Sequence, residues 1–183
     1  MADLAGQKMA FYGFTGMIDS NGVGRIAAAF NMAVNGACDE VHFCFSSLGG
    51  YVADGIYLYN HIRSLPVKVV AYNLGSVSSI AVAAFVAAEE RYCSIHAMFM
   101  IHPTSMPALE MTAQRLEGAL AAALADDGRT ESILRERTKL PDDLLSARKS
   151  KDVHITPEMA VKFGLVHGVR EFSLPHGHQI IQI

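Results

Sequence analysis

Residues 67–88 read VKVVAYNLGSVSSIAVAAFVAA, and the fold prediction depends on this stretch. Residues 67–72 form a β-branched, apolar run that predicts a strand buried on both faces. The Asn-Leu-Gly of residues 73–75 is expected to end that strand. Residues 78–88 are small and apolar almost all round, which is typical of a buried helix. The stretch therefore predicts a central strand that passes through a glycine turn into a helix inside the core.

Strand and helix patterns alternate on both sides of this stretch. Further strands are predicted at residues 9–14, 41–46, 91–93, 97–101 and 165–172. Further helices are predicted at residues 23–34, 52–64, 111–138, 141–150 and 157–164. Such alternation indicates stacked βαβ units with parallel strands. We expect a single α/β domain over residues 1–183, with a core at about 9–172 and a tail at 173–183.

Composition and charge disfavour several classes of partner. The formal net charge is −3 and the pI about 6.2, which gives no support for binding to nucleic acid or to an anionic membrane. Apolar residues make up 51% of the chain and charged residues only 18%. Because single domains rarely expose large apolar patches, this excess predicts surface that is buried against other subunits. A tightly packed monomer rich in small residues is the alternative.

The cysteines and the apolar runs bear on where in the cell the protein is located. Cys38, Cys44 and Cys93 are an odd number without C-x-x-C spacing, so neither a disulfide framework nor a zinc site is predicted. Cys44 and Cys93 lie in apolar strand patterns and are expected to be unreactive. No signal peptide is visible, and the apolar run near residues 80–88 is far shorter than the roughly 18 residues of a membrane span. We therefore expect a soluble, cytoplasmic protein.

A serine in the central stretch has the setting of a nucleophile. Residues 75–81 read GSVSSIA, and Ser79 is predicted to lie in the first turn of the helix. At that position the positive end of the helix and free backbone N–H groups stabilise negative charge that develops on a substrate. Ser76 and Ser78 also fit ordinary helix caps, so this segment alone does not establish a nucleophile.

Two more segments end predicted strands and hold residues suited to the same chemistry. Residues 46–50 read SSLGG, and ligands of α/β sheets collect at the edge where such a turn lies. His102 follows the strand at 97–101 and precedes Pro103, where a histidine could act as a base. An isolated Gly-Gly is usually a plain turn, and a lone histidine is usually structural. Neither a nucleotide-binding glycine motif nor a G-x-S-x-G elbow is present.

In this order and at this spacing, the segments resemble the proteolytic subunit of the Clp protease. Residues 46–50 are similar to the family's Asn-Ser-Pro-Gly-Gly loop, and Met100-Ile101-His102 matches the family unchanged. Residues 75–81 are similar to its Gly-x-Ala-Ala-Ser-Met-Gly segment, which places the nucleophile on Ser79. The similarity covers roughly residues 9–169.

A fourth motif supplies the third member of a triad. The family has an Asp followed by a Ser/Ala-x-Glu-Ala-x-x-x-Gly-Leu run, which is similar to residues 152–165 and assigns the role to Asp152. The resemblance then implies that Ser79 attacks the scissile carbonyl, that His102 carries the proton and that Asp152 orients the imidazole. It also implies an oxyanion hole formed by two backbone N–H groups. These belong to Gly50 and Ile80.

The resemblance further implies the architecture, activity and assembly. The fold is that of the Clp proteases and crotonases, a spiral of repeated β-β-α units with a long protruding helix. The activity is that of a serine endopeptidase that cleaves peptides or unfolded proteins without a metal or an organic cofactor. Family members enclose their active sites in a chamber, so a ring-forming homo-oligomer is expected, in one ring or two stacked rings.

Several departures from the family pattern limit this transfer. Leu48 replaces a proline, and Ser78 beside the expected nucleophile leaves open which hydroxyl attacks. The stretch after His102 is a few residues shorter than in the family, which leaves the ring-to-ring geometry open. The family's extended N-terminal segment, which meets an ATPase unfoldase, has no counterpart before Met9. An ATPase partner therefore stays open, and an ATPase-independent peptidase is an alternative.

Three other functions are compatible with parts of the pattern. A crotonase-type acyl-CoA enzyme shares the fold but works with carboxylates, and only Asp54 lies near the Gly-Gly turn. A membrane-associated peptidase with a Ser-Lys dyad needs a lysine near the serine, and residues 75–81 contain none. A non-catalytic assembly subunit of a protease complex would not need the intact serine, histidine and aspartate.

Overall fold

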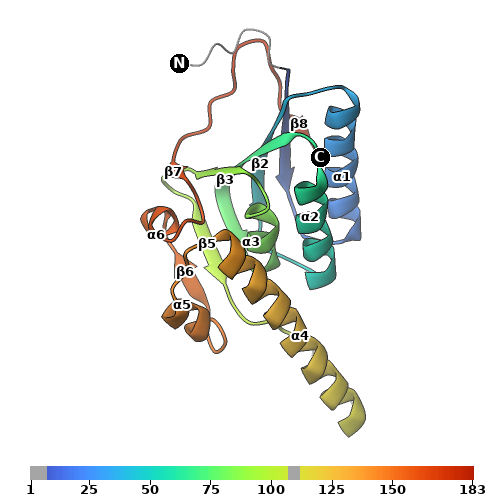
Figure 1. The fold of residues 1–183 in the computed structure, drawn as a ribbon, viewed down its shortest axis with the longest axis vertical. Coiled ribbons are helices and arrows are strands. Elements are labelled where there is room, and N and C mark those ends of the chain that lie inside the picture. Colours follow the sequence, from blue (N-terminus) through green and yellow to red (C-terminus); the bar gives the residue numbers. More distant parts are fainter. Residues whose placement is uncertain (1–7, 107–111) are drawn as a thin grey trace.

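The computed structural model describes residues 8–106 and 112–183, in which a twisted sheet is flanked by helices and one long helix protrudes (Figure 1). The strands are β1 (Met9–Thr15), β2 (Glu40–Ser47), β3 (Lys68–Ser78), β4 (Glu90–Cys93), β5 (Met98–Ile101), β6 (Val153–Ile155), β7 (Gly168–Val169) and β8 (Ile181–Gln182). The helices are α1 (Ser20–Asn35), α2 (Val52–Ser64), α3 (Ile80–Phe85), α4 (Ala113–Arg137), α5 (Asp142–Ala147) and α6 (Pro157–Lys162).

These strands join in one eight-stranded, mostly parallel sheet. The main path runs in the order β6-β5-β3-β2-β1-β8, and β4 pairs with β3 and β7 away from that path. Every pairing in the described residues is parallel except the antiparallel pair of β5 and β6. The predicted βαβ alternation and the α/β fold class are therefore confirmed.

The helix that follows β3 is buried, as its composition indicates. All six residues of α3 are buried, and it packs beside α2 under the sheet. Aromatic side chains of the strands and of α1 fill the neighbouring core, among them Phe14, Phe30 and Phe45. This packing fixes where β3 and α3 meet, and that junction carries the candidate nucleophile.

The predicted strand break at residues 73–75 is wrong. The Asn73 side chain donates to the Met98 carbonyl and accepts from the Gly75 N–H, both at 3.0 Å. These bonds satisfy the backbone at an irregular point, so β3 bends and continues to Ser78 instead of stopping. The second half of β3 then pairs with β5. The helix consequently begins at Ile80 and not at Ser78.

The C-terminal part also differs from its prediction. Only two residues of the strand expected at 165–172 are extended, as β7. The following chain crosses the sheet face, where the Phe172 ring packs on Phe11 and Tyr72, and then adds β8 to the edge of β1 (Figure 1). The aromatic contacts hold Phe172 against the sheet although it has no strand partner.

The long helix α4 matches its prediction closely and protrudes from the body (Figure 1). Its expected first residue, Met111, lies outside the described residues. Among the described positions of the helix, the buried ones are Ile133 and Leu134, near its C-terminal end. None of the helices in residues 8–106 and 112–183 combines the length and the apolar character needed to cross a membrane.

Candidate active site

Ser79 occupies a sharp turn between β3 and α3. Its φ is 59° and its ψ is −134°, and its N–H donates to the Met100 carbonyl at 2.8 Å. A non-glycine residue held at such a positive φ costs on the order of 1–3 kcal/mol, and strain of this kind gathers at functional sites. The next residue, Ile80, is buried at the start of α3.

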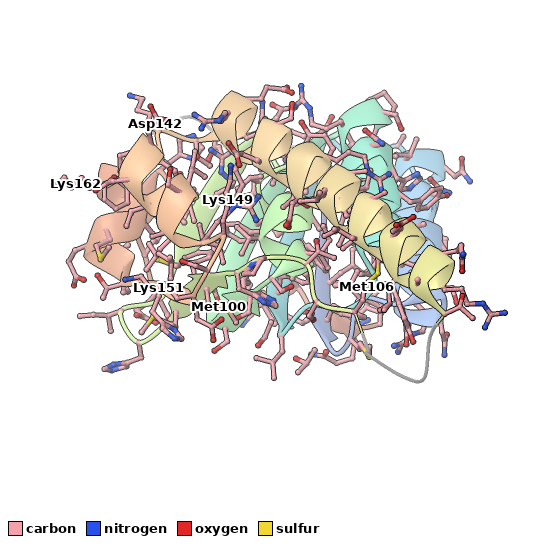
Figure 2. The ribbon with its side chains drawn as sticks, turned by 90° about the horizontal axis from the view of Figure 1, so that it is seen from below. Met100, Met106, Asp142, Lys149, Lys151 and Lys162 are labelled. Atoms are coloured by element: carbon pink, nitrogen blue, oxygen red, sulfur yellow. The ribbon has the colours of Figure 1, made fainter. Side chains whose placement is uncertain are left out.

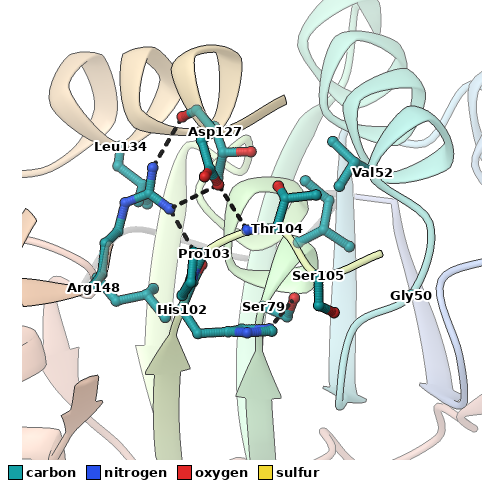
Figure 3. A pocket seen from close by; sticks show the side chains of 13 residues that line it. Gly50, Val52, Ser79, His102, Pro103, Thr104, Ser105, Asp127, Leu134 and Arg148 are labelled. Carbon is teal, nitrogen blue, oxygen red and sulfur yellow. Dashed lines mark hydrogen bonds and ion pairs between the residues drawn. The ribbon is translucent and has the colours of Figure 1, made fainter. Parts of the chain in front are cut away.

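His102 meets this serine because β5 runs parallel to the end of β3. Ser78 pairs with Met100, so the chain leaves β5 beside Ser79. The His102 Nε2 lies 2.8 Å from the Ser79 Oγ, within hydrogen-bonding distance (Figure 3). Ser78 is buried inside β3, and no hydrogen bond of the described residues joins it to His102. Of the two adjacent serines, Ser79 is therefore the one in contact with His102.

Asp152 lies beside His102 but does not engage it. Ile101 and Val153 are opposed in the antiparallel pair of β5 and β6, so His102 and Asp152 flank the same end of that ladder. Figure 2 shows Met100 next to Lys151, the residue before Asp152. The Asp152 side chain is exposed, and within the described residues no hydrogen bond links it to the imidazole. Catalytic hydrogen bonds are often loose in unliganded enzymes and tighten on binding.

The Gly49-Gly50 turn packs directly against Ser79. Gly49 has a φ of +102°, and a Cβ built on it would come within 2.6 Å of the Ser79 Cβ. Gly49 O accepts from Ile18 N–H, and Tyr51 N–H donates to Ile18 O, both at 2.8 Å. The N–H groups of Gly50 and Ile80 have no acceptor among the described residues. Both residues line the same cavity as Ser79.

A small cavity of about 60 Å³ opens beside the Ser79–His102 pair. Its walls are Gly50, Val52, Ser79, Ile80, Ile101, His102, Pro103, Thr104, Ser105, Asp127, Thr130, Leu134 and Arg148. Asp127 and Arg148 were missed from sequence, since each lies in an ordinary charged stretch without a motif. Across residues 8–106 and 112–183, no three His, Cys, Asp or Glu side chains gather as a metal site would require.

A wider, mainly apolar hollow of about 520 Å³ lies on the other side of the Gly49-Gly50 turn. It is lined by residues 15–17, at and just after the end of β1, and by residues 46–50. Met17 and Leu48 in its wall are large, apolar and exposed, at 53% and 78% of their surface. Exposed apolar groups that gather at a nucleophile indicate a surface for a ligand with apolar side chains.

Comparison with known proteins agrees with this geometry. The Clp protease family matches residues 14–172. The chain is 26% identical over 167 residues to the ATP-dependent Clp protease proteolytic subunit 2 of Pseudomonas aeruginosa, which covers 88% of this chain and 83% of the relative. It is also 26% identical over 132 residues to the protein of the same name from Chlamydia muridarum, covering 71% of this chain and 64% of that relative.

The family match covers both the Gly49-Gly50 turn and the Ser79–His102 pair, and it favours a peptidase over the crotonase-type alternative. The strained serine, the histidine in contact with it and the adjacent turn with free N–H groups are the parts that acyl transfer requires. The chain belongs to the Clp protease family and is a serine-type peptidase.

Proposed function

We propose that this protein is a serine endopeptidase that cleaves peptides or unfolded proteins, with Ser79 as nucleophile, His102 as base and Asp152 as the orienting carboxylate. The observation that carries the proposal is the 2.8 Å contact between Ser79 Oγ and His102 Nε2 at a strained strand-to-helix turn. A hydroxyl is a weak nucleophile unless a base removes its proton, and this contact supplies the base.

Each step of the reaction then has an assigned group. Ser79 Oγ attacks the scissile carbonyl as its proton passes to His102 Nε2, and a tetrahedral oxyanion forms. Gly50 and Ile80 line the same cavity, and their N–H groups, which lack other acceptors among the described residues, donate to that oxyanion. His102 gives the proton to the leaving amine, and water then hydrolyses the acyl-enzyme by the same route. One oxyanion donor is typically worth about 10²–10³ in rate.

Asp152 is assigned to orient the His102 ring through its Nδ1–H. The register of β5 and β6 supports the assignment, because it brings the two residues to the same end of one ladder. The carboxylate is exposed and has no hydrogen bond to another side chain of the described residues, so it is free to turn toward the imidazole. An orienting carboxylate stabilises the imidazolium and does not itself take the proton.

The hollow at Met17 and Leu48 supports an extended peptide as substrate. It is apolar and continuous with the Gly49-Gly50 turn, so a bound chain would pass from the hollow across the oxyanion donors to the small cavity. Backbone groups along that path suit recognition of a main chain more than of one side chain. This favours a peptidase with broad sequence tolerance.

We also assign a ring-forming homo-oligomer. Members of the Clp protease family form oligomeric chambers that act with Clp ATPases. In this chain Leu116, Leu120 and Leu124 are 51–61% exposed along one stripe of the protruding α4. Leucines at i, i+4 and i+8 on an exposed helix are suited to packing against another subunit. A cytoplasmic location fits the three cysteines, which are free.

The test is hydrolysis of fluorogenic peptides by the purified, assembled protein. The wild type should release the fluorophore, and Ser79→Ala should lose about 10⁴-fold or more of kcat/KM. Ser78→Ala is the matched control, because this neighbouring hydroxyl does not contact His102, and it should retain activity. Hydrolysis that survives in Ser79→Ala, or that is lost in Ser78→Ala alone, would reject the assignment.

A further inference from the structure

Arg148 is the largest fully buried side chain in the described residues. It follows α5 and leaves only 1% of its surface exposed. Burying a guanidinium is unfavourable unless its donors find acceptors and its charge finds a partner. The acceptors of its hydrogen bonds therefore indicate the role of the buried Arg148 side chain.

Those acceptors belong to the segment after the catalytic histidine and to α4. One Arg148 Nη donates to the His102 carbonyl at 3.2 Å, and the other donates to the Asp127 carbonyl at 2.9 Å (Figure 3). The charge is balanced by the carboxylates of Asp127 and Glu131, at 3.7 Å and 3.8 Å. The planar, forked guanidinium directs separate Nη donors at the two carbonyls in a fixed geometry, whereas the donors of a lysine all lie on one nitrogen at the end of a flexible stem.

Asp127 completes a clamp around the same segment. Its Oδ1 accepts from the Thr104 N–H at 2.8 Å while it faces Arg148. Arg148 thus holds the carbonyl of His102, and Asp127 holds the N–H two residues later. Pro103 lies between these two anchors, where its ring already restricts the backbone. The clamp consists of Arg148, Asp127 and the backbone of residues 102–104.

We propose that Arg148 is a positioning residue for the peptidase reaction: together with Asp127 it fixes the backbone at His102, so that the imidazole stays within hydrogen-bonding reach of Ser79. The proposal rests on the function assigned above to Ser79 and His102. It adds that α4, the helix with the exposed leucine stripe, is tied to the catalytic base through this clamp. Displacement of α4 at Asp127 would therefore be transmitted to His102.

The expected size of the effect follows from the geometry. His102 Nε2 is 2.8 Å from Ser79 Oγ, and a shift of 1 Å in a reacting group can cost about 10²-fold in rate. Arg148→Met removes both guanidinium donors of the clamp, and its loss of rate should approach about 10²-fold. Arg148→Lys keeps the charge but not the fork and should lose less. Asp127→Asn keeps an acceptor for Thr104 and should also fall between wild type and Arg148→Met.

The experiment measures the second-order rate constant for labelling of Ser79 by a fluorophosphonate probe, normalised to the final extent of labelling. Peptide kcat and KM are determined in parallel, at protein concentrations where sedimentation shows the same assembly. The three variants should label more slowly, and kcat should fall while KM stays close to wild type. A purely structural role would lower only the labelled fraction and leave the rate constant of the folded sites unchanged.

Arg91 provides the matched control. It is also a buried arginine, 5% exposed, and it donates to backbone carbonyls that include those of Ala88 and Leu165. None of its hydrogen bonds reaches a residue that lines the cavity at Ser79. Arg91→Lys and Arg91→Met should therefore lower the melting temperature without changing the labelling rate constant.

The outcomes separate this inference from the proposed function. Slower labelling in the Arg148 and Asp127 variants but not in the Arg91 variants supports the clamp. Wild-type rate constants in Arg148→Lys and Asp127→Asn overturn it, even where Arg148→Met fails to fold. Slowing of the same size in the Arg91 variants also overturns it, since that effect would be global. A wild-type protein that takes no label on Ser79 rejects the proposed function itself.

Discussion

Replacing Gly49 by alanine should disable the nucleophile without removing any catalytic group. Gly49 belongs to the turn that packs on Ser79, and a Cβ at this position would lie 2.6 Å from the Ser79 Cβ and 3.0 Å from the Ser78 carbonyl oxygen. Ordinary van der Waals contact for such a Cβ is 3.4–4 Å. The turn and the serine must therefore move apart by about 1 Å, because close-packed atoms cannot overlap.

Two costs follow from this clash. The backbone of Gly49, with a φ of +102°, is strained for any residue that has a Cβ, by on the order of 1–3 kcal/mol of stability. The separation of the turn from Ser79 also shifts the oxyanion donor of Gly50 relative to the attacking oxygen. A misplacement of about 1 Å costs on the order of 10²-fold in rate. Gly49→Ala should thus lose about 10²-fold of kcat/KM in the folded, assembled protein.

The assay compares peptide kcat/KM and thermal melting for Gly49→Ala and Gly177→Ala. Gly177 has a similar positive φ of +85°, but a Cβ there would meet no atom within 4 Å. The control therefore introduces backbone strain without the clash, and it should keep wild-type activity. If folded Gly49→Ala retained kcat/KM within about threefold of wild type, the reasoning from the turn to the oxyanion hole would be refuted.

Three further measurements test other parts of the account. Asp152→Asn should lower kcat by up to about 10⁴-fold, as for other triads. Because the side chain is exposed, the free energy of unfolding should stay within about 0.5 kcal/mol of wild type. A variant that loses stability but keeps its turnover would speak against the orienting role. Because the cavity beside Ser79 is small, about 60 Å³, peptides with alanine before the scissile bond should exceed those with phenylalanine by about tenfold in kcat/KM. The reverse order would place the substrate side chain elsewhere. Burial raises the pKa of the Cys44 thiol to about 12 and that of Cys93 to about 11. Both thiols should therefore resist iodoacetamide at pH 8 in the folded protein, while Cys38 reacts. Modification of Cys44 before unfolding would contradict the packing of the sheet.

Much of the fold could be predicted because the sheet follows local patterns. The helix at Val52–Ser64 has the predicted bounds, and α6 begins at Pro157 as predicted, where the Thr156 side chain caps it by accepting from the Met159 N–H. These features depend on residues close together in the chain. The bend at Asn73 escaped prediction because its side chain bonds to Met98, 25 residues away. The same limit applies to β8, whose partner β1 lies at the other end of the chain.

In the candidate site, only the residues that belong to sequence motifs could be predicted. The resemblance assigned Ser79 and His102, and their contact at 2.8 Å agrees with the roles given to them. Nothing in the sequence indicated that Ser79 would hold a positive φ, because residues with a Cβ rarely adopt one. Arg148 and Asp127 could not be found either, since charged side chains are normally solvated and only the tertiary fold buries Arg148 against the half-buried Asp127.

The most direct test of the central claim is the site of covalent modification in the assembled wild-type protein. A fluorophosphonate reacts with a serine whose hydroxyl is activated by a neighbouring base, and peptide mapping by mass spectrometry identifies that serine. The contact between Ser79 and His102 predicts one label per chain, on Ser79, and its loss in His102→Ala. A label on Ser78, or labelling of Ser79 that does not depend on His102, would contradict it.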